Sequence, residues 1–289
     1  MIYDIAHTTE YRFHQPVQLG LHRLSFRPRD GHDMRVLATE LDIFPQPLKV
    51  ELLHDVYGNS VAYVDPGQSS DVLRITSRFT VDHLGSRAFD MTTLPESSWM
   101  PPNYGMAERM ALTPFLHPSH DDPGDAVRSW AQGFVSGDGA GGPREVIVRM
   151  TEAIRSGFQY QSRFEEGTQT PQETLSMGSG ACRDFATLMI DALRRMGVAA
   201  RFVSGYLYVP EHDGVQGGGA THGWVQVYLP DCGWFPVDPT NNLIGGSDLI
   251  RIAVARDAAE VSPVSGEWFG AANDFAGLSV DVQVNARAA

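Results

Sequence analysis

The sequence predicts an α+β fold in two parts: an N-terminal antiparallel β-sandwich or barrel, and a core in which a helix packs on an antiparallel sheet. Three patterns predict it, namely strand-like alternation over residues 1–81, an amphipathic helix beside Cys182, and a β-hairpin from His222 to Asp238. The chain has 289 residues, the length of two domains at about 100–200 residues each. The division we expect is a β-domain at 1–90, a connector with a helix at 91–142, and a core with a C-terminal extension at 143–289.

The composition is that of a globular protein, and the charge restricts its partners. Hydrophobic residues make up 42% of the chain and charged residues 20%, which suffices for a sizeable core. The net charge of −13 disfavours nucleic acid phosphates and anionic membranes, because both require clustered cations. No apolar run reaches the roughly 20 residues of a membrane span, and the first residues do not resemble a signal peptide. We expect a cytoplasmic protein without a nucleic acid or membrane partner, and its oligomeric state stays open.

The N-terminal part has the pattern of short strands separated by turns. The strands are expected around Tyr3 to Phe13 and at 36–44, 48–53, 61–64 and 72–81. Between them, HQP, RPRDG, PQP, YGN and DPG supply the Pro, Gly, Asn and Asp residues that reverse an extended chain. We expect one antiparallel domain that serves as a scaffold or lid rather than as a substrate-binding module.

The connector contains one expected helix and a group of residues that imitates a metal site. The stretch SSWMPPNYG has no regular period, and a helix follows that begins at Asp122 or Asp125 and includes Phe134. The imitating group at the helix entry is His117, His120, Asp121, Asp122 and Asp125. Because no second group of ligands accompanies them, solvated capping is the better interpretation. A further helix is expected from Pro143.

Cys182 is the candidate nucleophile. Six apolar residues after it fall at helical spacing before Gly197 ends the helix: Phe185, Leu188, Met189, Ala192, Leu193 and Met196. The small residues GSGA precede Cys182, so the sulfur is expected at the helix N-terminus with little bulk around it. The helix dipole favours the thiolate there, and the unpaired amides can stabilise an oxyanion. A buried structural cysteine is the alternative, and the exposed helix start disfavours it.

His222 and Asp238 are the candidate base and orienting acid. A strand that starts at His222 and a return strand that ends at Asp238 bring both to one edge of a hairpin, with Cys232 at the opposite edge. A four-residue connection would pair Leu229 with Trp234 and place His222 and Asp238 on opposite faces. A triad therefore predicts an odd-length connection or a β-bulge.

At these residues the chain resembles the transglutaminase-like superfamily, specifically bacterial members with an N-terminal β-domain before a papain-like core. The matching segments are GSGACRDFATLMIDALRRMGVAARFVSGY, THGWVQVYLP and GWFPVDPTNN, with FQYQS and TPQETL upstream. The resemblance is strong over residues 158–242, and looser over the first ~85 residues and over IRIAVARDAAEVSPVSG. It departs at Gly223, where alanine is commoner, and at Gln226, where glutamate is frequent.

The resemblance implies a triad of Cys182, His222 and Asp238 that acts on peptide or glutamine-type amides through a thioester. Water as acceptor would make the protein a cysteine peptidase or amidase, and an amine would make it a transglutaminase; we favour hydrolysis. Tyr160 and Ala181 are candidates for a further oxyanion or substrate contact, although a core position is the better interpretation of Tyr160. The chemistry implies a peptide or protein substrate, no cofactor and no metal.

Two other functions stay open at this stage. The fold can serve as a non-catalytic module that binds a peptide or a cell-wall fragment, an interpretation that the loss of a triad residue would favour, and all three residues are present. The second alternative is a metal-dependent hydrolase that uses the cluster between His117 and Asp125.

Overall fold

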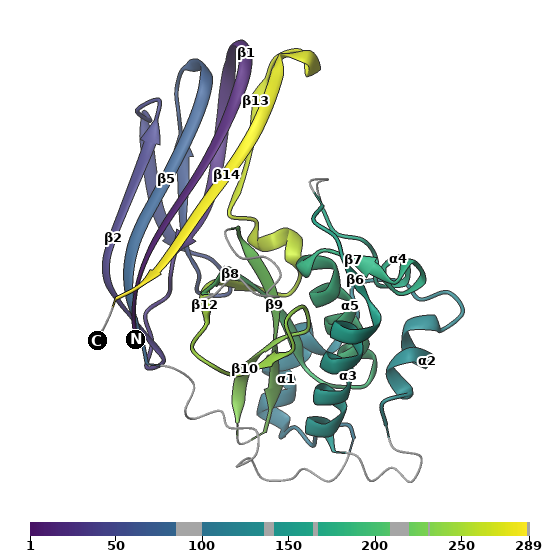
Figure 1. Ribbon diagram of the computed structural model, residues 1–289. Coiled ribbons are helices and arrows are strands. Elements are labelled where there is room, and N and C mark those ends of the chain that lie inside the picture. Colours follow the sequence, from purple (N-terminus) through teal and green to yellow (C-terminus); the bar gives the residue numbers. More distant parts are fainter. Residues whose placement is uncertain (85–99, 136–141, 164–166, 209–219, 231, 288–289) are drawn as a thin grey trace.

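A tall curved sheet stands beside a body of helices and a second sheet (Figure 1). The computed structural model describes residues 1–84, 100–135, 142–163, 167–208, 220–230 and 232–287. No helix among these residues is both long and apolar enough to cross a membrane. The α+β class predicted from the sequence is confirmed, and the expected boundary at residue 90 lies outside the described residues.

The curved sheet is antiparallel and forms a half-barrel. Its strands, in the order in which they lie, are β2 (Met34–Phe44), β5 (Ser69–His83), β1 (Ile2–Arg27), β4 (Ser60–Asp65) and β3 (Lys49–His54). Every second residue from Tyr3 to Thr9 is buried, which is the alternation of a strand with one face on a core. The strands expected after Phe13 are present to within a few residues. The turn expected at HQP is absent: β1 continues through Pro16, and its pairing with β5 shifts register between Arg12 and Val17, an irregularity that accommodates a proline.

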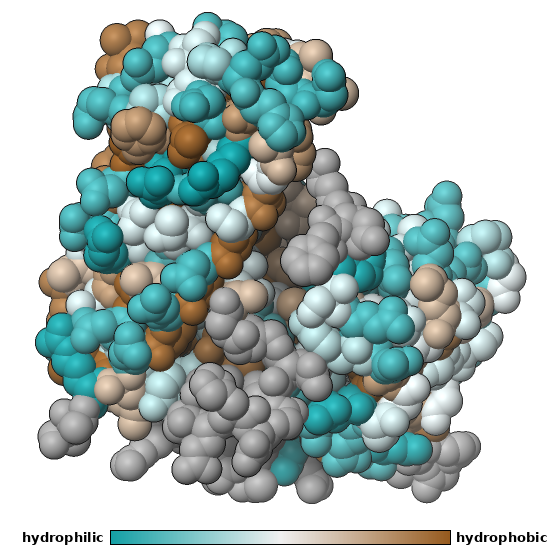
Figure 2. All heavy atoms as spheres, turned by 45° about the horizontal axis from the view of Figure 1, so that its top comes forward, coloured by the Kyte–Doolittle hydropathy of each residue, from teal (hydrophilic) through white to brown (hydrophobic). Residues whose placement is uncertain are grey.

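The C-terminal segment, expected as an extension of the core at 143–289, pairs with this sheet. Strands β13 (Val264–Phe269) and β14 (Phe275–Ala286) both pair antiparallel with β1. They pair with residues 18–24 and 3–13 of β1, stretches that also pair with β4 or β5. Hydrophobic atoms form a diagonal band that follows the course of β14, where Leu278 and Val280 are exposed (Figure 2).

The second sheet carries the hairpin that the sequence predicts. Its strands lie in the order β11 (Leu243–Ile244), β10 (Gly233–Asp238), β9 (His222–Leu229), β8 (Ala200–Leu207) and β12 (Leu249–Ala255). Both strands of the predicted hairpin are present, β8 pairs with β9, and β12 adds an edge beside β8. The N-terminal domain supplies none of these strands, as expected.

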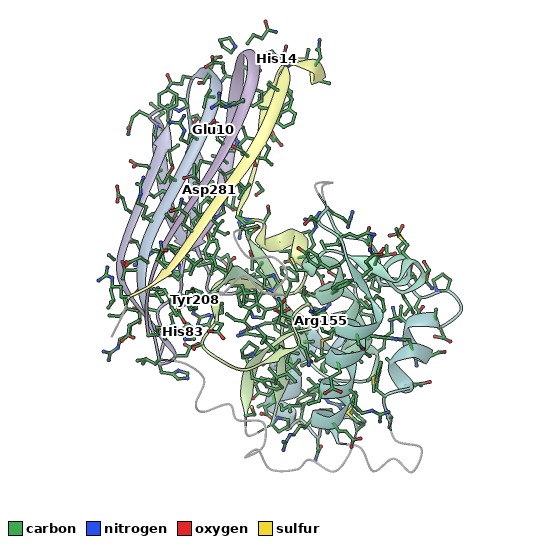
Figure 3. All side chains as sticks on the ribbon, viewed as in Figure 1. Glu10, His14, His83, Arg155, Tyr208 and Asp281 are labelled. Carbon is green, nitrogen blue, oxygen red and sulfur yellow. The ribbon has the colours of Figure 1, made fainter. Side chains whose placement is uncertain are left out.

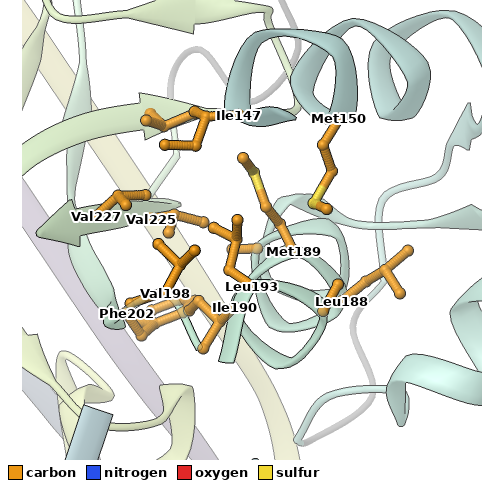
Figure 4. Close-up of a cluster of buried hydrophobic side chains, with 14 of the residues drawn as sticks. Ile147, Met150, Leu188, Met189, Ile190, Leu193, Val198, Phe202, Val225 and Val227 are labelled. Carbon is orange, nitrogen blue, oxygen red and sulfur yellow. The ribbon is translucent and has the colours of Figure 1, made fainter. Parts of the chain in front are cut away.

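The cysteine helix α5 (Cys182–Arg195) packs on this sheet, and α2 (Ala126–Gln132) and α3 (Pro143–Gly157) pack on α5. Met189 and Leu193 of α5 meet Val225, Val227 and Ile147 in one buried cluster (Figure 4). Each such side chain contributes about 1.5–3 kcal/mol when it is fully buried. The period of these apolar residues predicts α3 and α5 correctly.

Two helices were not expected. α1 (Met106–Leu116) lies where the sequence suggests an irregular connector, since it contains Pro114 and buries only Leu112. α4 (Pro171–Met177) begins with a capping box, in which the Thr170 hydroxyl accepts from the Glu173 N–H and the Glu173 carboxylate accepts from the Thr170 N–H. That signal, with a proline at the first helical position, was present in TPQE.

Polar and apolar contacts join the curved sheet to the second sheet. Tyr208 and His83 lie where the two sheets meet, whereas His14 lies at the far end of the curved sheet (Figure 3). The Tyr206 hydroxyl and His7 Nδ1 are 2.7 Å apart in a buried hydrogen bond. The side chain of Asn59 donates to the Val254 carbonyl and accepts from its N–H, at 2.7 and 2.9 Å.

Replacing Asn59 by alanine removes the side chain that bonds both backbone groups of Val254. We expect Asn59→Ala to lower the free energy of unfolding by about 2–4 kcal/mol, because the N–H and C=O of Val254 lose their side-chain partners. Urea unfolding measures this loss. Asn285→Ala, at an exposed position of β14, is the control and should change stability by less than about 0.5 kcal/mol. Equal stability of the two variants would contradict the role of Asn59.

Candidate active site

Cys182 is the first residue of α5 and is partly exposed. The short strand β7 (Ser179–Gly180) leads to it and pairs in parallel with β6 (Gln159–Tyr160). At Gly180 a Cβ atom would lie only 2.9 Å from Asp184 Cβ, so the approach to the cysteine has no room for a side chain. The expected position at a helix start is therefore what the structure shows.

Asp184, which the sequence analysis missed, fastens this helix start. Its buried carboxylate accepts from the backbone N–H groups of Ala181 and Gln169, both at 2.8 Å, and from the Arg163 guanidinium at 2.7 Å. The amide of Ala181 thus already has an acceptor, which argues against Ala181 as an oxyanion donor. The amide of Cys182 has no acceptor among the described residues and is the donor that the helix start offers.

His222 and Asp238 lie on one face of the β9–β10 hairpin. Leu229 pairs with Gly233, so the connection has three residues, and Val225 pairs with Val237. Asp238 is therefore opposite Trp224 in the register. Because Trp224 is two residues after His222 on β9, Asp238 and His222 point to the same face of the hairpin. The predicted odd-length connection is confirmed. His222 Nε2 and Asp238 Oδ2 are 2.8 Å apart, and both side chains are fully buried.

The Asp238 carboxylate has two further hydrogen bonds. The Thr240 N–H donates to Oδ1 at 2.9 Å, and Asn241 Nδ2 donates at 2.8 Å to Oδ2, the oxygen that also contacts His222. Asn242 follows with φ = 56°, a left-handed conformation that asparagine tolerates in turns. Asn241 lies in the matching segment GWFPVDPTNN, but it was not among the site residues expected from the sequence.

Charges within this group favour a thiolate and an imidazolium. Burial raises the pKa of the Cys182 thiol, but the neighbouring His222 imidazole with its charge and the backbone N–H of Gly223 outweigh burial and lower the pKa. Burial lowers the pKa of His222, whereas the charge and hydrogen bond of Asp238 raise it to about 10. Because Asp238 occupies Nε2, Nδ1 is the ring nitrogen available to Cys182; Nδ1 has no partner of standard hydrogen-bond geometry among the described residues.

Trp224 covers the histidine. Its ring stacks on that of His222, with centroids 5.9 Å apart and planes at 26°. The indole is 1% exposed, so it keeps water from this side of the His222–Asp238 pair. Trp224 was not among the site residues expected from the sequence. Its position two residues after His222 on the same strand places both side chains on one face, which could have identified it.

The two remaining candidates, Tyr160 and Cys232, lie in different surroundings. Tyr160 lies beside Gly180 and packs edge-on against Phe185 at 6.4 Å, and burial followed by the charge of Cys182 raises its pKa. It is a partly buried residue that packs against the core close to the site. Cys232 lies at the opposite end of the hairpin against the core, and burial raises the pKa of its thiol.

The group of His and Asp residues between His117 and Asp125 precedes α2, and one of its members caps that helix. Asp122 accepts from the N–H groups of Val127 and Arg128 at 3.1 and 3.0 Å, as the capping interpretation expects. In the part of the chain that the structure describes, no three His, Cys, Asp or Glu side chains are arranged to hold a metal ion.

Two family models match the chain. The model of the Transglutaminase-like superfamily covers residues 128–239, which contain Cys182, His222 and Asp238. The model of the Bacterial transglutaminase-like N-terminal region covers residues 3–82, which are the first five strands of the half-barrel.

Relatives that match over nearly their whole length and a solved structure agree with these matches. An uncharacterised protein of Mycobacterium tuberculosis is 30% identical over 301 residues, covering 97% of this chain and 92% of its own. One of Mycobacterium leprae is 25% identical, covering 92% of each chain. A crystal structure from Cytophaga hutchinsonii, provisionally named a cysteine protease, has the same fold with a TM-score of 0.73 at 20% identity, covering 99% of this chain and 89% of that one. The chain belongs to the transglutaminase-like superfamily and joins its core to the N-terminal region of the bacterial members.

Proposed function

We propose that the protein is a cysteine-dependent peptidase or amidase that hydrolyses amide bonds of peptides or proteins through a thioester. The observation that carries the proposal is the juxtaposition of Cys182, His222 and Asp238, in which a helix-terminal thiol of lowered pKa faces a histidine held by a buried carboxylate at 2.8 Å. Nucleophile, base and orienting acid are thus all in reach of one another.

The residues suffice for both halves of the reaction. The Cys182 thiolate forms a C–S bond with the amide carbonyl carbon, and the Cys182 N–H faces the oxyanion that develops. As the C–N bond breaks, His222 gives its proton to the leaving amine, which leaves a thioester and a neutral imidazole. His222 then takes a proton from water, whose oxygen attacks the thioester carbonyl. Collapse of that intermediate breaks the C–S bond and yields a carboxylic acid and the free thiol.

Water is favoured over an amine as the acceptor, since it needs no second binding site. A non-catalytic binding module on the same fold is less favoured, because it would have no use for a buried charged pair beside a thiol of lowered pKa. The cost of desolvating such a pair is several kcal/mol per ion.

The first prediction from this site concerns the thiols. At pH 6–7, iodoacetamide should label Cys182 at least about tenfold faster than Cys232, because a lowered pKa increases the thiolate fraction and a raised pKa decreases it. The rate at Cys232 should climb as the pH rises above 8, while that at Cys182 changes less. Peptide mass spectrometry measures both rates in one sample, and equal labelling of the two thiols would refute an activated nucleophile.

The second prediction concerns the orienting acid. Asp238→Asn should reduce the rate of acyl-enzyme formation from p-nitrophenyl acetate by roughly two to four orders of magnitude, because the imidazole loses the partner that fixes its tautomer and stabilises its charge. The circular dichroism spectrum should be unchanged. Asp281→Asn, at an exposed site on β14, is the matched control and should keep the wild-type rate. Full activity of Asp238→Asn would exclude the triad.

The third prediction concerns the acceptor. With casein as substrate, the protein should create new peptide termini or free acids that carry ¹⁸O from labelled water, and Cys182→Ala should create none. Incorporation of monodansylcadaverine in preference to ¹⁸O would instead identify a transglutaminase and reject hydrolysis, while it would leave the cysteine mechanism intact.

A further inference from the structure

Arg201 lies at the start of β8, and its side chain has an unusual place in the second sheet. Its neighbour Phe202 joins Val225 and Val227 of β9 in the apolar cluster that packs on α5. Arg201 pairs with Gln226, and both alternate with these apolar residues. Because successive side chains of a strand point to opposite faces, Arg201 and Gln226 lie on the face that is turned away from this cluster.

The guanidinium of Arg201 has no carboxylate partner in the part of the chain that the structure describes. Five other arginines with side chains no more than 21% exposed each have a carboxylate oxygen within 3.1 Å, in the pairs Arg23–Asp55, Arg163–Asp184, Arg194–Asp257, Arg195–Asp191 and Arg251–Asp33. A cation that gives up hydration is ordinarily compensated by such a partner. Arg201 is the exception that requires an explanation.

Two neighbours hold the guanidinium without neutralising its charge. Arg201 Nε donates to the Gln226 carboxamide oxygen at 2.9 Å, and Gln226 is buried. The guanidinium carbon lies 4.1 Å from the centroid of the Trp234 ring, which covers one face of its plane. Among the described residues, no acceptor contacts the two terminal nitrogens of Arg201. These nitrogens form the fork with which arginine binds both oxygens of a carboxylate or a phosphate.

The surrounding charges are also positive. Burial lowers the pKa of Arg201 to about 9, and the charges of Arg251 and Arg29 lower it further, while no carboxylate counteracts them. The nearby Asp33 carboxylate is already taken by Arg251 at 2.9 Å. At pH 7 Arg201 keeps its charge, because this pKa is still about two units higher. A chain with a net charge of −13 thus has a local excess of guanidinium groups at this point.

We propose that Arg201, Gln226 and Trp234 form a binding site for an oxyanion, the phosphate or carboxylate group of a small ligand. The terminal nitrogens of Arg201 donate to two oxygens of the anion, Gln226 fixes the direction of the fork, and Trp234 supports its plane. Arg201 and Trp234 are both partly exposed, so an anion can reach the fork from solvent. The site uses no residue of the proposed triad and does not depend on the proposed chemistry.

The test titrates the full chain with sodium phosphate and, separately, with sodium acetate at pH 7, with sodium chloride holding the ionic strength constant. We expect at least one of the two anions to change the tryptophan fluorescence in a saturable way, because the Trp234 ring lies against the guanidinium. The same anion should raise the melting temperature, since it binds the folded chain. Cys182→Ala should respond as the wild type does.

Gln226→Glu is the decisive variant, because it keeps the shape of the side chain and places a carboxylate beside Arg201. It should weaken anion binding by at least about tenfold, since the new internal ion pair competes with the ligand. Its melting temperature in chloride should equal or exceed that of the wild type, so loss of binding is not loss of folding. Arg35→Gln removes the same charge at an exposed position of β2 and should bind as the wild type does.

Three results would overturn the proposal. They are no saturable response to either anion, wild-type affinity in Gln226→Glu, and an equal loss of affinity in Arg35→Gln, which would indicate a response to overall charge. Saturation by phosphate alone supports the site and identifies a phosphate ligand, and saturation by acetate alone supports it and identifies a carboxylate.

Discussion

The buried hydrogen bond between His222 and Asp238 is the constraint on which the catalytic half of the structure depends. A charged pair without solvent contact loses several kcal/mol of hydration per ion, and only close geometry and additional hydrogen bonds offset that loss. Here the Thr240 N–H and the Asn241 amide occupy further lone pairs of the carboxylate. Removal of either partner would leave the other as an uncompensated buried charge. The three-residue connection and the turn after Asp238 must therefore keep their geometry together.

The thiol reaches this pair from a separate part of the chain. Asp184 holds the start of α5 by accepting hydrogen bonds from Ala181, Gln169 and Arg163, and the apolar face of α5 then aligns the helix on the second sheet. In the proposed mechanism, the helix start also supplies the amide that faces a developing oxyanion. The nucleophile and the base are thus positioned by different networks, one at a helix N-terminus and one at the end of a hairpin, which the core beneath α5 joins.

How far the sequence can predict this structure depends on whether the determining interactions are local. The helical period after Cys182 and the alternation around His222 are local, and they predict α5, β9 and β10 together with the three candidate residues. Strand partners are not local: residues 275–286 alternate like a strand, but nothing in that pattern names β1 as their neighbour. The face shared by His222 and Asp238 depends on the partner of Leu229, which alternation alone leaves undetermined. Asp184 and Asn241 escaped notice because an acid in a first helical turn and an asparagine in a turn are common at surfaces.

Strand β8 couples the N-terminal domain to the site. Gly205 pairs with His222, and a Cβ atom at this position would lie 2.6 Å from the Trp224 ring, so glycine makes the space in which the indole stacks on the histidine. The next residue, Tyr206, bonds to His7 of β1 and packs in the cluster shared by the two sheets. Because Gly205 and Tyr206 are consecutive residues of β8, a displacement of β1 relative to β8 would disturb the support of Trp224. The half-barrel is therefore part of what holds the histidine in place.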